Sequence, residues 1–139
     1  MIVWNTEYDK LPLENIKIVE ERLSQKFPND YVECVIEYQG GRPSLCNIKI
    51  TENETIQFCC LLTFLAFDDL DILEVYNSIK RKIPSSLIPF GLGSDNYLFC
   101  FDYRFGAPPA IVVYKPNESL QLEPIYISDS FKNFINKLF

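Results

Sequence analysis

The chain has 139 residues, of which 47% are hydrophobic and 23% charged, a composition typical of folded globular proteins and not of disordered chains. At this length we expect one domain over residues 1–139, with enough apolar side chains to bury a core. The net charge of -6 argues against nucleic acid as a direct partner, because binding phosphates needs clustered Lys and Arg. It suits a basic protein partner, or solubility alone.

The sequence offers little material for catalysis or metal binding. It contains no histidine, so a Ser-His or Cys-His nucleophile pair cannot be built. Its cysteines lack metal-ligand spacing, and we expect them to be reduced, largely buried apolar side chains of a cytoplasmic protein. They are Cys34, Cys46, Cys59, Cys60 and Cys100. We therefore predict neither a metal nor a cofactor.

No segment has the features of a secretion signal or a membrane span. The N-terminal residues lack a basic region followed by a long apolar one. The longest apolar run, residues 58–67, is far shorter than the roughly 20 residues that cross a bilayer. We expect a soluble, cytoplasmic chain that does not contact membranes.

Two amphipathic helices are predicted near the N-terminus. Apolar residues recur at helical spacing over residues 13–26 and again over residues 31–38. Asn29 or Asp30 can cap the second helix. The glycine pair at 40–41 stops it, and we expect one of these glycines in the left-handed conformation that closes a helix.

From residue 44 the period of the apolar residues changes from that of a helix to that of a strand. Asn47–Thr51 and residues 56–62 read as two strands, and the polar residues Glu52, Asn53 and Glu54 between them predict a hairpin turn. Residues 63–67 either prolong the second strand or begin a loop, since periodicity does not separate these two cases.

An acidic cluster precedes a third predicted helix. Asp68, Asp69 and Asp71 come just before a stripe of apolar residues that includes Leu73 and runs to residue 83. Acidic residues stabilise the N-terminal end of a helix, so the cluster has a structural explanation. The same cluster, joined by Glu74, is alternatively a patch that binds a partner, and the two interpretations are compatible.

The most apolar short strand of the chain is predicted at Tyr97 to Asp102. Its residues are apolar on both faces, which places it in the middle of a sheet. Phe99 and Phe101 should face one way, and Leu98 and Cys100 the other. The preceding Gly91-x-Gly93 pattern is interpreted as a turn and not as a phosphate-binding loop, because no helix follows it.

The last third of the chain predicts two strands and a terminal helix. A strand over residues 110–115 is followed by a turn at 116–118 and a short strand over residues 125–127. Ser128 or Asp129 is expected to cap the final helix. The predicted fold class is α+β, with strands in the middle of the chain and helices towards both ends.

Some common residue types keep two interpretations. The aromatic residues form either a core of bulky rings or an exposed tyrosine-rich contact surface. Asp95 and Asp102 flank the central strand, so catalysis by a pair of carboxylates is conceivable, although nothing in the spacing selects such a pair. The run from Asp102 to Arg104 is expected to form a local polar cluster where the strand ends.

A series of short motifs spans residues 13–139. It comprises a helix ending in Phe-Pro-Asn-Asp-Tyr at 27–31, Glu-Tyr-Gln-Gly-Gly at 37–41, Ile-Pro-Phe-Gly at 88–91, Asp-Asn-Tyr-Leu-Phe-Cys-Phe-Asp-Tyr at 95–103, the strand at 111–114, and the terminal helix with its Ser-Phe and Phe-Ile pairs at 130–135. This series resembles the SUKH superfamily, which also contains fungal cell-wall synthesis regulators. Gln39 departs from the Asn expected before the glycine pair, and residues 48–83 contain no recognised motif.

The resemblance implies an α+β domain without catalytic activity. It implies two N-terminal helices, a central mixed or largely antiparallel sheet, a helix after Asp68 and a C-terminal helix packed on the sheet. Bacterial members are commonly immunity proteins that bind and neutralise a cognate polymorphic toxin, often a nuclease, inside the cell. The alternative that the family offers is a regulatory or scaffolding adaptor that binds host proteins.

If the chain is an immunity protein, we expect its toxin to be basic and to be attracted to acidic residues. We expect a monomer or a weak homodimer that occludes the toxin, and exposed Tyr and Arg residues to join the contact. The candidate contact residues are Glu52, Glu54, Asp68, Asp69, Asp71, Glu74, Asp95, Tyr103 and Arg104.

Overall fold

The centre of the protein is a six-stranded antiparallel sheet in which every strand pairs with the next one along the chain. The computed structural model describes residues 2–84, 86–115 and 123–139. The sheet contains β3 (Asn47–Thr51), β4 (Glu54–Leu61), β5 (Leu87–Gly93), β6 (Leu98–Asp102), β7 (Ala110–Tyr114) and β8 (Ile125–Ser128). The predicted α+β class and the largely antiparallel sheet are confirmed, whereas the predicted turn at 116–118 lies outside the described residues.

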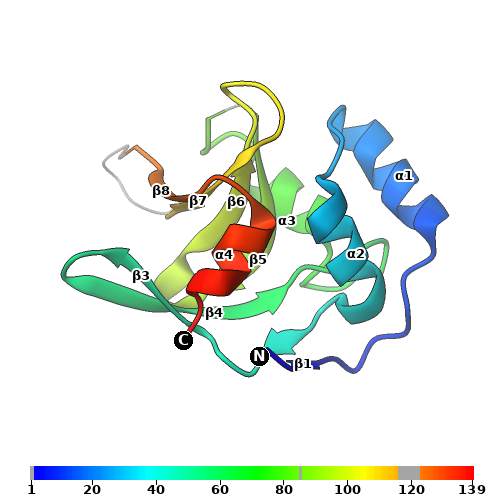
Figure 1. Cartoon of the computed structure of the whole chain (residues 1–139). Helices are drawn as coiled ribbons and strands as arrows, with labels where there is room; N and C mark the ends of the chain where they lie inside the picture. The colour runs from blue at the N-terminus through cyan, green and yellow to red at the C-terminus, as the bar shows by residue number, and fades with distance from the viewer. Residues whose placement is uncertain (1, 85, 116–122) are drawn as a thin grey trace.

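Helices cover both faces of this sheet (Figure 1). They are α1 (Leu13–Leu23), α2 (Asn29–Tyr38), α3 (Ile72–Ile79) and α4 (Phe131–Lys137). Helices α2 and α4 cover one face: the Tyr31 ring of α2 lies 4.9 Å from that of Phe101. Helix α3 packs through Val75 and Ile79 on the other face. The predicted packing of the C-terminal helix on the sheet is therefore confirmed.

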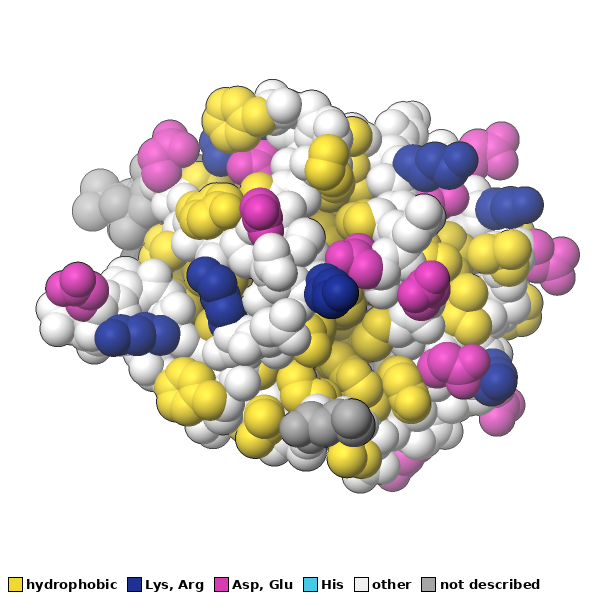
Figure 2. Space-filling view, in the orientation of Figure 1, with side chains coloured by type: hydrophobic (Ala, Val, Ile, Leu, Met, Phe, Trp, Pro, Cys, Tyr) yellow, Lys and Arg dark blue, Asp and Glu magenta, His cyan; other side chains and the backbone are white. Residues whose placement is uncertain are grey.

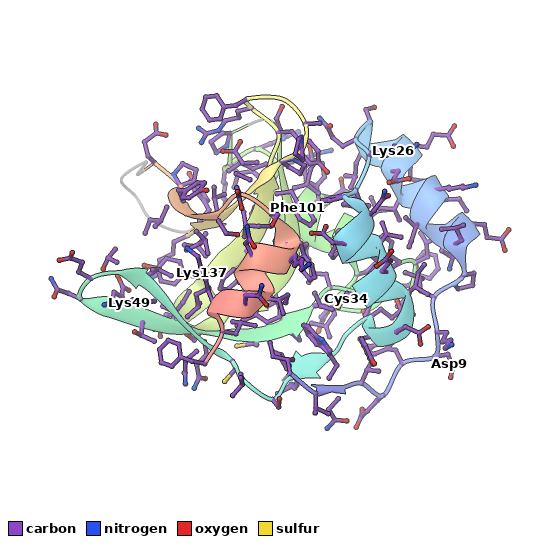
Figure 3. All side chains as sticks on the ribbon, in the orientation of Figure 1. Asp9, Lys26, Cys34, Lys49, Phe101 and Lys137 are labelled. Atoms are coloured by element: carbon purple, nitrogen blue, oxygen red, sulfur yellow. The ribbon has the colours of Figure 1, made fainter. Side chains whose placement is uncertain are left out.

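The central strand has the two apolar faces that its sequence predicts. Phe99 and Phe101 of β6 belong to the large core beneath α2 and α4 (Figure 3). Leu98 and Cys100 of the same strand belong to the second, smaller cluster beneath α3. Alternation of side chains along a strand produces this division. Most of the aromatic residues are accordingly buried in the core. Of the two interpretations of the aromatic residues, a core of bulky rings is therefore correct, and an exposed tyrosine-rich surface is not.

Strand β5 corrects the prediction of a turn at Gly91-x-Gly93. Both glycines lie inside this strand, opposite β4. A Cβ atom at Gly91 would lie 2.4 Å from the Phe58 ring, so the glycine makes room for a core aromatic. Pro89 cannot donate a hydrogen bond, and the pairing of β5 with β6 shifts register between Pro89 and Gly91. Glycine and proline therefore serve packing here, and not chain reversal.

The helix caps differ in part from the predicted ones. Pro28, and not Asn29 or Asp30, precedes α2, while the Asp30 carboxylate accepts a hydrogen bond from the Lys132 N–H of α4 at 2.9 Å. Helix α4 is capped by Ser130, and not by Ser128 or Asp129.

Gly40 closes the second helix region with a φ of 69°, as the glycine pair predicts.

Short elements near the two ends of the chain complete the fold. Strands β1 (Trp4–Asn5) and β2 (Arg42–Pro43) form a two-stranded sheet that the sequence pattern did not predict. At the other end, Phe139 and Asn47 exchange two backbone hydrogen bonds of 2.9 and 3.0 Å. Lys137 Nζ donates to the carbonyl of Ile127 at 2.8 Å. Residues 137–139 are thus bonded to both edge strands of the large sheet.

Candidate partner-binding site

The structure separates the candidate contact residues into three groups. The first group lies at the tip of the β3–β4 hairpin, where Glu52 and Glu54 are exposed. Asp95 is exposed in the short 3-10 helix η1 (Ser94–Asn96), which contacts β4. The Tyr97 hydroxyl donates to Glu54 Oε2 at 3.2 Å. These three carboxylates therefore share one end of the sheet.

The second group lies where β6 ends, and here one expectation is wrong. Tyr103 was expected to be exposed, but only 8% of it is, and its hydroxyl donates to the carbonyl of Lys26 at 2.7 Å. Arg104 donates through Nε and Nη2 to the two oxygens of Asp102, each at 3.0 Å. This pairing raises the pKa of Arg104 and confirms the predicted polar cluster.

Asp95 and Asp102, the two carboxylates that flank the central strand, do not come together. Asp95 precedes β6 and Asp102 is its last residue, so a five-residue strand separates them. Asp102 is also buried and bonded to Arg104. The geometry therefore offers no paired carboxylates at these positions for acid–base chemistry.

The third group belongs to residues 63–71, which we call the β4–α3 loop, and to the first turn of α3. Asp71 is only 2% exposed and caps the helix: its Oδ1 accepts from the Leu73 N–H at 2.9 Å. Its Oδ2 accepts from the Phe67 N–H, also at 2.9 Å. The capping explanation thus holds for Asp71, whose carboxylate is engaged inside the protein.

Asp68 fastens the same loop to the N-terminal segment. Its Oδ2 accepts from the Tyr8 hydroxyl at 2.5 Å, and its Oδ1 accepts from the Thr63 hydroxyl and the Leu70 N–H, each at 3.1 Å. The Tyr8 hydrogen bond is the largest cause that lowers the pKa of Asp68. The same bond raises the pKa of Tyr8 to about 12. Asp68 is therefore a structural carboxylate that is half-buried.

Asp69 and Glu74 remain as exposed acidic residues on and beside the loop. Glu7, also exposed, precedes Tyr8 and so adds its charge where Tyr8 meets Asp68. Among the residues that the structure describes, none of these three carboxylates forms an ion pair. Their charge is therefore directed to solvent.

Phe67 is the exposed apolar residue of this loop, and 81% of it is accessible to solvent. Its φ is 56° and that of Leu65 is 54°, a left-handed conformation that bulky residues rarely adopt. This conformation was not predicted, because Phe67 ends an apolar run that reads equally well as strand or loop. An apolar run, interrupted at Thr63, that ends directly before an acidic cluster was the available signal.

Gln39 fixes the other end of the loop, although its side chain had no predicted role. Its Nε2 donates to the carbonyl of Asp9 at 3.0 Å, and its Oε1 accepts from the Phe64 N–H at 3.1 Å. The side chain is buried at the end of α2 and links that helix, the loop and the N-terminal segment, on which Figure 3 labels Asp9. A long amide side chain suits this bridging position.

A cavity of about 440 Å³ opens beside the loop. Tyr8 and Leu70 line it together with Glu7, Arg42 and Cys59. Burial raises the pKa of the Cys59 thiol, so this thiol stays protonated at neutral pH.

Charge is distributed unevenly over the face of the molecule that Figure 2 draws. Acidic side chains are spread over the α1 and α2 side of that face, with basic side chains among them. Lys49 and Lys137, labelled in Figure 3, lie on the β3 hairpin and on α4. A charged partner would therefore encounter different fields at the two sides.

The described residues contain neither a metal-binding cluster nor a membrane-spanning helix. No group of three or more Cys, Asp or Glu side chains in residues 2–84, 86–115 and 123–139 is arranged to hold a metal ion. In the same part of the chain, every helix is too short or too polar to cross a membrane.

Comparison with known proteins identifies the family of the chain. None of the curated proteins matches it. The SUKH_6 family model, described as SMI1-KNR4 cell-wall, matches residues 13–135. This match covers both N-terminal helices, the whole sheet and most of α4. The protein therefore belongs to the SUKH superfamily.

Proposed function

We propose that this protein is an immunity protein: it binds a cognate toxin protein one to one and neutralises it by covering the toxin's working surface. Membership of the SUKH superfamily supports a binding role without catalysis. The observation that carries the proposal beyond the family is a set of exposed carboxylates that form no ion pair with any described residue, namely Glu7, Asp69 and Glu74.

These carboxylates suit a basic partner such as a nuclease. A nuclease surface that binds phosphates is rich in Lys and Arg. Opposite charge accelerates the encounter of two proteins and disfavours partners of the wrong charge. A net charge of -6 acts in the same direction over the whole molecule.

A regulatory adaptor that binds host proteins is the second candidate. The description of the matching family model, SMI1-KNR4 cell-wall, favours it. An adaptor binds several host proteins, whereas an immunity protein binds one toxin. The number and kind of partners therefore separates the two candidates.

Co-expression tests the immunity function. The products of the genes next to this protein's gene are screened as candidate toxins: each is induced in cells with and without the protein, and survival is counted. We expect survival only with the protein, together with a one-to-one complex on size-exclusion chromatography. A catalytically inactive toxin domain is the control for expression load. Equal killing in both strains, with no complex, would contradict the proposal.

Salt dependence adds a second measurement. Exposed charges are screened over about 8 Å at physiological ionic strength and over about 3 Å at 1 M. We therefore expect the association rate to fall markedly between low and high salt. An association rate that does not change with salt concentration would exclude electrostatic steering. It would not contradict the proposal that the protein occludes the toxin.

A further inference from the structure

The ring of Phe67 is exposed although the rest of its loop is firmly bonded to the protein. Of this residue 81% is accessible, and no ring–ring or cation–π contact involves it among the described residues. Transfer of a phenylalanine side chain from water into an apolar pocket contributes about 1.5 to 3 kcal/mol. The ring of Phe67 is therefore exposed in the free protein, and its burial against a partner would contribute favourably to binding.

The backbone on each side of Phe67 is already fixed. The N–H of Phe67 donates a hydrogen bond to the Asp71 side chain. In the same way, the N–H of Phe64 donates to Gln39 and the N–H of Leu70 donates to Asp68. Thr63 and Leu70 add a backbone hydrogen bond of 2.8 Å across the base of the loop. A loop that is ordered before binding loses less conformational entropy when it binds.

The surroundings of Phe67 are acidic. Asp69 lies two residues further along the loop, and Glu74 lies in the first turn of α3. Glu7 precedes Tyr8 in the N-terminal segment, and the Tyr8 hydroxyl bonds to Asp68 of the loop. An apolar group surrounded by carboxylates matches a partner surface that has an apolar pocket among basic residues.

Phe105 provides an internal contrast, because it is exposed to nearly the same extent, at 86%. The Arg104 guanidinium lies over its ring, 5.3 Å from the centroid. Arg104 itself is paired with Asp102 and Glu123. Phe105 thus contacts a basic side chain of its own protein. Phe67 has no such ring contact among the described residues, and the charged residues next to it in the sequence are acidic.

We propose that the β4–α3 loop is the toxin-contacting surface and that Phe67 is its anchor, inserted into an apolar pocket on a basic face of the toxin. This inference rests on the proposed immunity function. Glu7, Asp69 and Glu74 form the charged rim that orients the partner. The cavity lined by Tyr8 and Leu70 opens at the same loop, so it is available to a side chain of the partner.

Binding measurements on matched variants test this inference. Titration of each candidate toxin compares the unchanged protein with Phe67→Ala, Phe67→Asn and Phe105→Ala. Asn tolerates the left-handed backbone of residue 67, so that variant removes the ring without added strain. We expect both Phe67 variants to weaken binding at least 30-fold, the range of an interface hot spot, and Phe105→Ala to change it less than threefold.

Charge reversal at the rim gives an independent readout. We expect Asp69→Lys to slow association at low salt more than at high salt, with thermal melting unchanged. The matched control is Glu52→Lys, which makes the same charge change at the distant hairpin tip. An equal effect of the two reversals would contradict the assignment of the loop.

Failure of the inference and failure of the proposed function give different results. If the unchanged protein binds and protects but both Phe67 variants do so equally well, the contact lies elsewhere and immunity stands. If the unchanged protein neither binds nor protects, the immunity function falls and the inference falls with it. Melting curves of all variants ensure that a loss of binding is not a loss of folding.

Discussion

The aromatic core and the β4–α3 loop hold their phenylalanines in opposite ways. In the core, rings order one another: Phe90 stacks on Phe101 at 4.4 Å, and Phe58 meets Phe99 edge-on at 5.0 Å. In the loop, hydrogen bonds order the backbone and leave the ring of Phe67 in solvent. The comparison teaches that one residue type serves stability where rings pack, and is available for recognition where only the main chain is held.

The largest effect is expected in the core. Phe99→Ala should lower the free energy of unfolding by about 3 to 5 kcal/mol, because it removes a fully buried ring and leaves a cavity. Urea denaturation measures this change. Phe105→Ala, at an exposed position, is the control and should alter stability little. If the two variants melted alike, the assignment of Phe99 to the core would be wrong.

The next largest effect is expected at Asp71. Asp71→Ala removes the cap of α3 and the acceptor of the Phe67 N–H together, so we expect a loss of about 2 to 3 kcal/mol. Hydrogen exchange should also show faster exchange of the amides of residues 67 and 73. Asp69→Ala changes an exposed neighbouring carboxylate and serves as the control. Unchanged exchange in Asp71→Ala would show that hydrogen bonds do not order the loop.

A smaller, pH-dependent effect is expected at Tyr8. Tyr8→Phe removes the hydrogen bond to Asp68 and should cost about 1 to 2 kcal/mol at pH 7. The lowered pKa of Asp68 means that this stabilisation is present above the unfolded pKa, about 3.9, and is lost as the pH falls through the folded pKa. The raised pKa of Tyr8 means that it is present below about 10 and lost as the pH rises towards about 12.

Denaturation at a series of pH values measures this prediction. The difference between Tyr8→Phe and the unchanged protein should be widest near neutral pH and should shrink in both acid and alkali. Tyr126→Phe, at a position that is 61% exposed, is the matched control. A difference that stays constant at every pH would show that Tyr8 acts through packing and not through its hydroxyl.

The smallest effect on stability is expected at Phe67 itself. Phe67→Ala removes an exposed ring, so the free energy of unfolding should change by less than about 0.5 kcal/mol. Thermal melting checks this change beside the binding measurement. A large loss of stability would show that the ring is part of the core. It would contradict the distinction between the aromatic core and the β4–α3 loop.

Periodicity predicted the parts of this fold in which a whole face of an element is apolar. The alternation of Phe99 and Phe101 with Leu98 and Cys100 was sufficient to place β6 in the middle of the sheet. Strand β5 was missed because Pro89 and its glycines resemble a turn, whereas their purpose becomes visible only once the Phe58 ring lies against Gly91. Packing across strands is not encoded in local sequence.

The candidate site was predicted only in part, because some of its contacts join residues that are far apart in the sequence. The acidic cluster marked the start of α3 correctly, and Asp71 is its cap. The sequence did not show that Asp68 bonds to Tyr8, because 60 residues separate the two in the chain. It also did not show the left-handed backbone of Phe67, a conformation that phenylalanine does not prefer.

The bonds that residues 137–139 make to β3 and β8 bear on how the protein behaves at high concentration. Unpaired backbone groups at the edge of a sheet are templates on which another molecule can add a strand. Phe139 occupies the backbone groups of Asn47, and Lys137 occupies the carbonyl of Ile127. Edge-to-edge aggregation at these positions must first displace these residues, a safeguard at the high concentration that the proposed one-to-one inhibition of a toxin would need.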